Sequence, residues 1–239
     1  MISHLGDAAS ARYAVYFAPA QDSLLWQAGC RWLGRDAANG ETQQQPAVPG
    51  WPPGRVHRIT ASARLYGLHA TLKAPFHLLP GCDPQALDEA IAAFADARAP
   101  LAGLQLVLAP LAGFLALQPS APGAPLLELA AACVRAFDAF RRPPDTEELR
   151  RRRAGGLSAR QDTLLLQFGY PYVLDEFRFH ITLTDRLAPD EMDSLQPWLA
   201  GYFLDALRAP LTLSDICLFV QDAPGVPFRL ARRYPLRAR

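Results

Sequence analysis

The chain has 239 residues, half of them hydrophobic, which is enough to bury a core in one large domain or in two joined lobes. Its 24 lysines and arginines almost balance its 23 aspartates and glutamates, so the formal net charge is only +1. This balance excludes an overall field that would bind long nucleic acids or an anionic membrane. We therefore expect any anionic ligand to be bound at a local site.

Common catalytic and targeting signals are absent from the sequence. It contains no GxxxxGK[ST], GxGxxG, HExxH or GxSxG pattern. The four cysteines (Cys30, Cys82, Cys133 and Cys217) lie far apart without a CxxC pair, and we expect them to be reduced and structural. No basic segment with an apolar stretch opens the chain, and no apolar run approaches the roughly 18 residues of a spanning helix. We expect a cytoplasmic protein that has no contact with membranes and uses no cofactor or metal.

The first predicted elements are a strand, a helix and a long loop. Aromatic and β-branched residues predict a strand over 11–19, and helical spacing follows over 22–34 with Asp22 as the N-cap. Residues 34–57 are rich in Gly, Pro and Gln and have little periodicity. Such a loop is often functional or mobile, and we interpret it as a candidate flexible lid.

The rest of the first half alternates between strand and helix. The run YGLHATLKAPF predicts a strand over 66–76. Asp83 and Pro84 mark the start of a helix over 83–98, because Asp is a favoured N-cap and Pro fits the first turn. Two short strands around a tight turn follow within 104–119.

The second half repeats this plan. The expected elements are helices over 124–141, 144–171 and 188–207, and strands over 176–187, 211–221 and 227–236. We expect Gly155 and Gly156 to break the second helix and Pro197 to interrupt the third. The four arginines 150–153 cover all sides of one helical turn, which favours a solvated face over an anion-binding patch.

One motif occurs on two of the predicted strands. His69-Ala-Thr71-Leu and His180-Ile-Thr182-Leu share the pattern H-x-T-L and begin 111 residues apart. Each copy precedes a helix and a hairpin, as an internal duplication would require. A solvated strand face would explain one copy, but two matching histidines and two matching threonines favour a site.

Alternation along a strand predicts which side chains share a face. Side chains at i, i+2 and i+4 project from the same side. The expected polar faces are His69, Thr71 and Lys73 in the first copy, and Arg178, His180, Thr182 and Thr184 in the second.

Two histidines that face each other suit cleavage of a phosphodiester without a metal. Displacement at phosphorus needs a base on the attacking oxygen and an acid on the leaving oxygen, and imidazole can serve as either near neutral pH. Thr71 and Thr182 would donate hydrogen bonds to the non-bridging oxygens. Lys73 and Arg178 would offset the charge that builds up in the transition state.

These motifs resemble the 2H phosphoesterase superfamily, whose hallmark is two H-x-[ST]-x motifs. The segments RYAVYFAP, WLGRDA, GFLAL and FGYPYVLDEFRFHITLTDRL resemble one branch of it, a poorly characterised bacterial family found with phosphonate-utilisation operons. The resemblance implies an α+β fold with two pseudo-symmetric lobes, each an antiparallel sheet flanked by helices, around a central groove. It implies one bilobal domain over 1–239, with lobes over 11–120 and 121–239 and room for strand exchange between them.

The same resemblance implies roles for individual residues. His69 and His180 would be the general acid and base, although the sequence leaves open which is which. Thr71 and Thr182 would contact the phosphate. Further phosphate-binding candidates extend the motifs or lie near them in the sequence: Lys73, Thr184, Arg178, Tyr66 and Tyr172.

Three functions remain open at this point. The leading expectation is a monomeric cyclic phosphodiesterase for a small ribose-phosphate-type substrate, with a possible role in phosphonate metabolism. The second is an enzyme that acts on RNA ends with 2′,3′-cyclic phosphates or 2′-5′ linkages, which the near-zero net charge disfavours. The third is a non-catalytic protein that binds a phosphate ligand.

Overall fold

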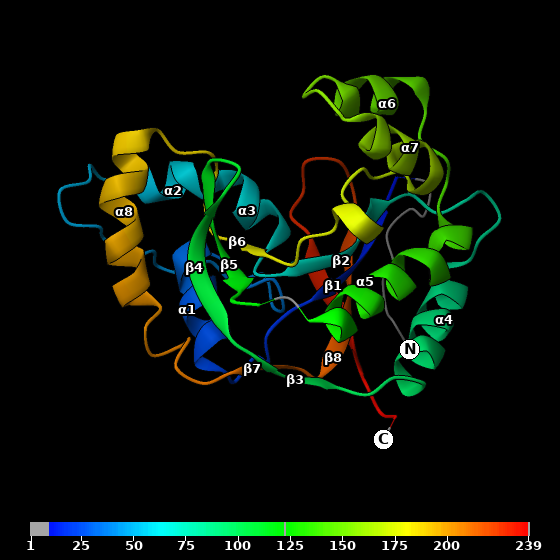
Figure 1. The fold of residues 1–239 in the computed structure, drawn as a ribbon, viewed down its shortest axis with the longest axis horizontal. Coiled ribbons are helices and arrows are strands. Elements are labelled where there is room, and N and C mark those ends of the chain that lie inside the picture. The colour runs from blue at the N-terminus through cyan, green and yellow to red at the C-terminus, as the bar shows by residue number, and fades with distance from the viewer. Residues whose placement is uncertain (1–9, 122, 239) are drawn as a thin grey trace.

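The computed structural model describes residues 10–121 and 123–238 and shows a mixed α+β fold (Figure 1). The helices are α1 (Leu24–Leu33), α2 (Arg55–Ile59), α3 (Ala61–Tyr66), α4 (Pro84–Asp96), α5 (Ala124–Ala136), α6 (Thr146–Arg153), α7 (Ala159–Phe168) and α8 (Pro189–Tyr202). The strands are β1 (Arg12–Phe17), β2 (Ala70–Phe76), β3 (Leu101–Leu104), β4 (Leu106–Leu111), β5 (Phe114–Pro119), β6 (Ile181–Thr182), β7 (Leu211–Leu213), β8 (Asp215–Gln221) and β9 (Arg229–Pro235). Short 3₁₀ turns cover Asp138–Phe140 and Leu174–Glu176. The expected α+β class is confirmed.

Seven of these strands form one sheet in the order β4-β5-β6-β2-β1-β8-β9, and β3 pairs with β7 separately. All neighbouring strands are antiparallel. The sheet has a three-stranded part and a four-stranded part, which meet where Ala70 of β2 pairs with Ile181 of β6. Each part contains strands from both halves of the sequence, because β6 joins β4 and β5 while β8 and β9 join β1 and β2. The H-x-T motifs therefore lie at the junction of the two parts.

Helices cover the two parts of the sheet separately. Helix α5 packs on β2 and helix α4 on β8 and β9, whereas α8 packs on β4 and β5 (Figure 1). Trp32 links helix α1 to the residue that follows β6, because its indole N–H donates to the carbonyl of Leu183 at 2.8 Å. Helices α6 and α7 form a hairpin that projects beyond the sheet (Figure 1). The longest described helix has 14 residues, and none that the structure describes is long and apolar enough to cross a membrane.

The expected helices are all present, but α5 and α8 end at Ala136 and Tyr202, earlier than predicted, and α2 and α3 were not predicted. Asp83 caps α4 as expected, and the break between α6 and α7 falls at residues 154–158. The N-cap of α1 is Ser23, not Asp22, because the Ser23 hydroxyl accepts from the backbone N–H of Trp26 at 3.1 Å. Helix α8 runs through Pro197, so the predicted interruption is wrong. Stacking of Trp198 on Tyr202, with ring centroids 5.4 Å apart, holds the helix together after the proline.

The two strands that carry the motifs are shorter than the sequence predicts. The first begins only at Ala70, since Tyr66 ends α3 and Gly67 has a φ of 80°. A Cβ at Gly67 would lie 2.5 Å from the Ala37 Cβ, so only glycine fits this bend. The second is reduced to Ile181–Thr182. Both motif histidines therefore stand just before a strand, His69 before β2 and His180 before β6.

The segment over 34–57 is packed rather than free along much of its length. The Gln45 amide donates to the carbonyl of Trp32 at 2.7 Å. Trp51 and Arg55 bind Ser194 and Glu191 of α8 through a hydrogen bond and an ion pair. The segment thus links α1 to α8, and closure over a site remains a prediction.

Candidate active site

The sheet register brings the two H-x-T motifs together. Ala70 and Ile181 are directly opposite each other, and both are fully buried. In an antiparallel pair this register sets His69 opposite Thr182 and Thr71 opposite His180. Because successive side chains alternate between faces, these four side chains lie on the face away from Ala70 and Ile181. An approximate two-fold axis through the Ala70–Ile181 pair therefore relates the two copies.

Both histidine rings are oriented by the same kind of contact. Nδ1 of His69 lies 2.9 Å from the carbonyl oxygen of Gly67, and Nδ1 of His180 lies 2.7 Å from that of Arg178. A carbonyl oxygen only accepts hydrogen bonds, so each Nδ1 carries the proton and donates. Each ring consequently offers Nε2 as a free base or acceptor. The two copies thus match in the orientation and tautomer of the ring.

Burial keeps both imidazoles neutral. The pKa of His69 is lowered from 6.5 to about 4, mainly by burial and to a smaller extent by the nearby charge of His180, while the bond to the Gly67 carbonyl opposes the shift. Burial also lowers the pKa of His180, opposed by its bond to the Arg178 carbonyl. Since the large shift falls on His69, a proton that enters the site goes first to His180.

Aromatic rings enclose the two histidines unequally. The ring of His69 stacks on Tyr16 of β1 with centroids 3.9 Å apart, and Tyr66 lies at 5.9 Å. His180 has one ring contact among the described residues, with Phe114 at 5.8 Å. Sequence reasoning missed Tyr16, and its only signal was its place on a strand that could pair with the first motif.

The threonines at the third motif position stay near the rings. The hydroxyl of Thr71 lies 3.3 Å from Nε2 of His69, and it donates if that nitrogen is unprotonated. Thr71 and Thr182 are both partly exposed, so their hydroxyls can reach a ligand.

The side chains at the fifth position of each motif, Lys73 and Thr184, do not line up with the histidines and threonines as the sequence predicts. Lys73, the only lysine of the chain, is 3% exposed, and its ammonium donates to Asp138 at 2.7 Å and to the Val134 carbonyl at 3.0 Å. A bulge between β1 and β2, where the partner of Thr71 directly adjoins the partner of Lys73, turns this side chain toward α5. The Thr184 hydroxyl is also buried and accepts from the Leu115 N–H at 2.9 Å.

The three weaker candidates have different surroundings. Arg178 is exposed, and its backbone carbonyl rather than its side chain is what contacts His180. Tyr172 is 47% exposed and lies edge-on to Tyr170. Tyr66 is the best placed of the three, because it lies beside His69 and also lines a neighbouring pocket.

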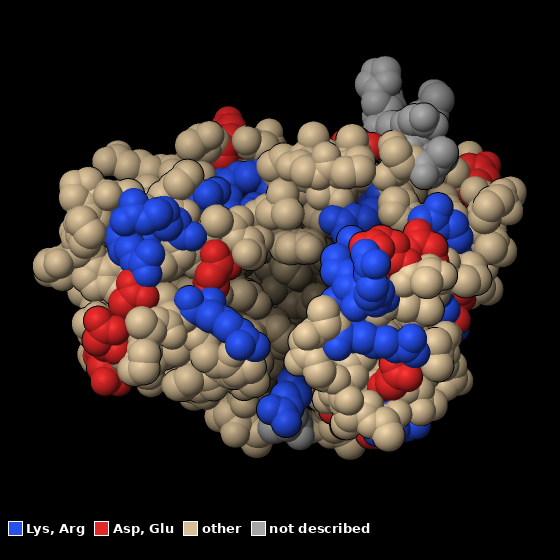
Figure 2. All heavy atoms as spheres, turned by 90° about the horizontal axis from the view of Figure 1, so that it is seen from above, with Lys and Arg blue, Asp and Glu red and all other residues tan. Residues whose placement is uncertain are grey.

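That neighbouring pocket has a volume of about 480 Å³ and is lined by five arginines: Arg12, Arg141, Arg142, Arg151 and Arg152. Figure 2 shows a hollow in the middle of one face, between the side that carries α2, α3 and α8 and the side that carries α6 and α7. Basic side chains lie on both sides of this hollow. The sequence favoured a solvated face for residues 150–153, whereas Arg151 and Arg152 line the pocket.

Ligands for a metal do not gather anywhere in the described part of the chain. No group of three or more His, Cys, Asp or Glu side chains lies close enough there to hold a metal ion. The four cysteines are free thiols, three of them buried.

Comparison with known proteins points to one family. Residues 71–229 match DUF1045, described as a protein of unknown function, a span that includes Thr71 and the second motif. The chain is 41% identical over 228 residues to the ribose 1,5-bisphosphate phosphokinase PhnN of Janthinobacterium sp. (strain Marseille), covering 94% of this chain and 50% of that protein. It is 41% identical over 224 residues to the protein of the same name from Laribacter hongkongensis (strain HLHK9), covering 92% and 51%. The chain thus spans about half the length of the curated relatives it matches.

Solved structures show more distant likenesses. A crystal structure of a phosphoesterase is similar with a TM-score of 0.45 and 14% identity, over 96% of this chain and 99% of that chain. E. coli LigT complexed with 3′-AMP is similar with a TM-score of 0.45 and 12% identity, over the same shares of the two chains.

Proposed function

The chain belongs to the DUF1045 family, and from its two-histidine site we propose that it is a metal-independent phosphoesterase that opens a small cyclic phosphodiester of ribose-phosphate type. One observation carries this proposal: both motif histidines donate Nδ1–H to the carbonyl two residues earlier and so offer Nε2 to the same junction. A matched pair of imidazoles meets the need of an in-line displacement for a base and an acid on opposite sides of phosphorus.

His69 is the proposed base and His180 the proposed acid. With a pKa lowered to about 4, His69 stays deprotonated at neutral pH and can take a proton from the attacking water. The new bond joins the water oxygen to phosphorus, and the bond from phosphorus to the leaving oxygen breaks. His180 gives its proton to that leaving oxygen. A phosphate bound beside His180 raises its pKa, because a negative charge favours the protonated ring.

Thr71 and Thr182 are the proposed contacts to the non-bridging oxygens. They follow the two histidines by two residues and are partly exposed on the same face. Hydroxyl donors placed where charge develops lower the barrier without moving during the reaction. The near-equivalent positions of the two threonines support one contact to each side of the phosphate.

The names of the curated relatives support a phosphorylated ribose as the substrate class but not a kinase activity. They are named for a kinase of ribose 1,5-bisphosphate, and the chain spans only about half of their length. The 239 residues contain no GxxxxGK[ST] loop to hold a nucleotide triphosphate. A role in phosphonate metabolism is part of the proposal and rests on the family resemblance of the sequence.

The proposal is tested by a screen of cyclic and linear phosphate esters in the presence of EDTA. We expect the wild type to open at least one cyclic ester and a His69→Ala/His180→Ala protein to open none. Activity that survives the double substitution would rule out the two-histidine mechanism. Binding of esters without turnover by the folded wild type would support a ligand-binding protein instead. Equal rates on a mononucleotide and an oligonucleotide 2′,3′-cyclic phosphate would favour the small substrate over an RNA end.

A further inference from the structure

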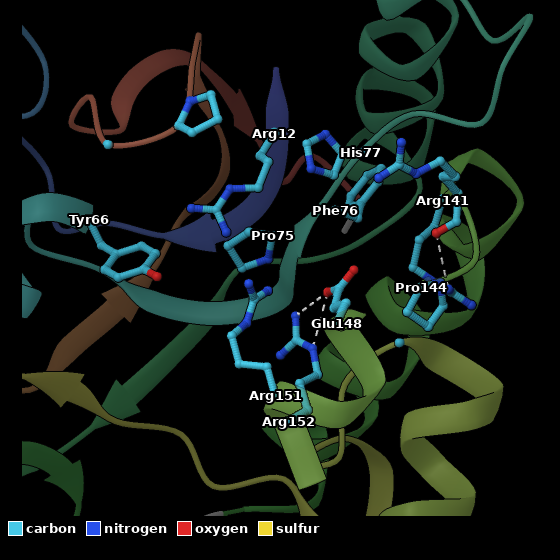
Figure 3. Close-up of a pocket in the computed structure, with 14 residues that line it drawn as sticks. Arg12, Tyr66, Pro75, Phe76, His77, Arg141, Pro144, Glu148, Arg151 and Arg152 are labelled. Atoms are coloured by element: carbon cyan, nitrogen blue, oxygen red, sulfur yellow. Dashed lines mark hydrogen bonds and ion pairs between the residues drawn. The ribbon is translucent and has the colours of Figure 1, made fainter. Parts of the chain in front are cut away.

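The arginine pocket, lined by the five arginines named above, lies next to the histidine site. Tyr66 connects the two, since its ring lies 5.9 Å from that of His69 and it also lines the pocket. Arg12 comes from β1, the strand whose Tyr16 stacks on His69. In Figure 3 the guanidinium groups of Arg12 and Arg151 extend from β1 and α6 into the same opening, and the Tyr66 hydroxyl is turned toward it. A ligand held at the histidines can therefore extend into this pocket.

The pocket has more positive charge than its own carboxylates balance. Arg141 is paired with Asp138, and Arg152 with Glu148, the only carboxylate among the described residues that line the pocket. Arg12 donates to the neutral side chain of Gln221. The remaining two, Arg142 and Arg151, make no side-chain hydrogen bond or ion pair with any described residue. Three guanidinium groups are thus without an acidic partner in the described part of the chain.

The rest of the surroundings disfavours a purely structural role for these charges. Helix α6 buries none of its residues, so packing does not explain why it presents Arg151 and Arg152 to the cavity. The ring of His77 lines the cavity too, and its pKa is lowered by burial first and then by the charges of Arg142 and Arg12. Repulsion among the cations is relieved when an anion binds between them.

The charge and the size of the pocket together indicate the ligand. A phosphate monoester carries between one and two negative charges at neutral pH and offers three acceptor oxygens, which suits several planar guanidinium donors. A cavity of about 480 Å³ takes a small group. The net charge of only +1 for the whole chain gives no continuous basic surface for a polymer.

We propose that the arginine pocket binds a second phosphate group of the same substrate, so that the substrate is a small phosphodiester that also carries a phosphate monoester. This inference rests on the proposed function for the reacting phosphate. The histidines cleave one phosphate, and Arg12, Arg142 and Arg151 bind the other. Binding energy from the distant phosphate then positions the reacting one.

The pocket is tested without catalysis by calorimetric titration of inorganic phosphate into the His69→Ala/His180→Ala protein. We expect phosphate to bind to this protein. Adding Arg142→Gln and Arg151→Gln should weaken the binding by at least about 10-fold. The matched control adds Arg150→Gln and Arg208→Gln, which remove two equally charged arginines that are 77% exposed and paired outside the pocket. No phosphate binding to the histidine variant, or the same loss in the control, would overturn the assignment.

The link to the reacting phosphate is tested with adenosine 2′,3′-cyclic phosphate and its 5′-phosphorylated form. The wild type should prefer the 5′-phosphorylated compound by about 10-fold or more in kcat/KM. Arg142→Gln/Arg151→Gln should remove this preference, whereas the Arg150→Gln/Arg208→Gln control should keep it. Equal kcat/KM values in the wild type would overturn the second-phosphate proposal. If neither compound nor any cyclic ester of the screen above is opened, the proposed function fails, and the phosphate titration still decides whether the pocket binds an anion.

Discussion

The two copies of the motif, residues 69–73 and 180–184, agree where they face each other and differ where they are anchored. His69 and His180 have the same ring orientation and the same bond to the preceding backbone. Their fifth positions share neither residue type nor partner. Lys73 binds Asp138 and α5, while Thr184 binds the backbone of β5. The first copy runs into a seven-residue strand and the second into a strand of two residues.

This difference shows that the approximate two-fold symmetry relates only the residues around the Ala70–Ile181 pair and does not extend to the whole lobes. The side chains that surround a bound phosphate must be matched, because both ends of an in-line displacement need a proton carrier. The anchors only have to hold each copy on its own part of the sheet. Any pair of buried, satisfied polar contacts does this.

The largest expected effect comes from replacing one of the two matched histidines. His69→Gln and His180→Gln should each lower kcat on a cyclic phosphate by about 10²- to 10⁴-fold. On a p-nitrophenyl phosphodiester, whose leaving group needs no proton, His180→Gln should lose little and His69→Gln should lose the full factor. Steady-state kinetics of both variants on both substrates check this. The reverse pattern would contradict the assignment of His69 as base.

The loss of folding stability at acidic pH should distinguish the His69 imidazole from that of His180. The imidazole of His69 titrates near 6.5 in the unfolded chain and at about 4 in the folded one, so the folded state resists protonation. Its contribution is fully present above pH 6.5 and is lost as the pH falls toward 4. At about 1.4 kcal/mol per pKa unit, the loss approaches about 3 kcal/mol.

We therefore expect chemical denaturation to show a smaller fall in stability between pH 7 and pH 4.5 for His69→Gln than for the wild type. His180→Gln should reduce the fall less than His69→Gln does. A pH dependence that is unchanged by either substitution would contradict the burial of neutral histidines.

If Thr71 and Thr182 make equivalent contacts to the phosphate, substituting either one should lower activity by a similar factor. Thr71→Val and Thr182→Val each remove one hydroxyl and keep the shape of the side chain, and each should lower kcat/KM by about 10-fold. Circular dichroism serves as the control for folding. A loss confined to one of the two variants would show that only one copy contacts the phosphate.

The smallest expected effects concern the anchors. Lys73→Met should destabilise the fold by about 1–2 kcal/mol, because Asp138 retains Arg141 as a partner, and Thr184→Val by about 1 kcal/mol. Denaturant titration measures both. Turnover per folded molecule should be unchanged in each, whereas a specific loss of kcat in Lys73→Met would place the ammonium in the chemistry.

Local patterns in the sequence predicted the motif but not its surroundings. Alternation along the chain indicated that His69 and Thr71 share a face, and the second copy made a site the better explanation. The direction of Lys73 could not be foreseen, since it depends on a bulge against β1, a strand more than 50 residues earlier. The predicted solvent exposure of residues 150–153 holds for Arg150, Arg151 and Arg153, but one helix alone could not show that Arg151 and Arg152 also line a pocket.

The arginine pocket shows the same limit. Arg12, Arg142 and Arg151 come from separate segments, and no spacing rule links them before the sheet and the α6–α7 hairpin are in place. The short β6 was also beyond prediction, because the residues around Ile181 alternate like those of a full strand. After Thr182, the backbone N–H groups of Leu183 and Thr184 both donate to the carbonyl of Leu115, and that of Asp185 donates to Ile59 at the end of α2.

The most direct test of the paired-histidine account is the single-turnover rate on a cyclic phosphodiester in EDTA for the wild type, His69→Ala, His180→Ala and the double variant. When two groups act together in one reaction step, substituting either one removes most of the rate enhancement that the pair provides. We predict that the double variant is within about 10-fold of the slower single variant. Losses that multiply across the two sites, or a single variant with wild-type rate, would contradict the claim that the two imidazoles act on one phosphate.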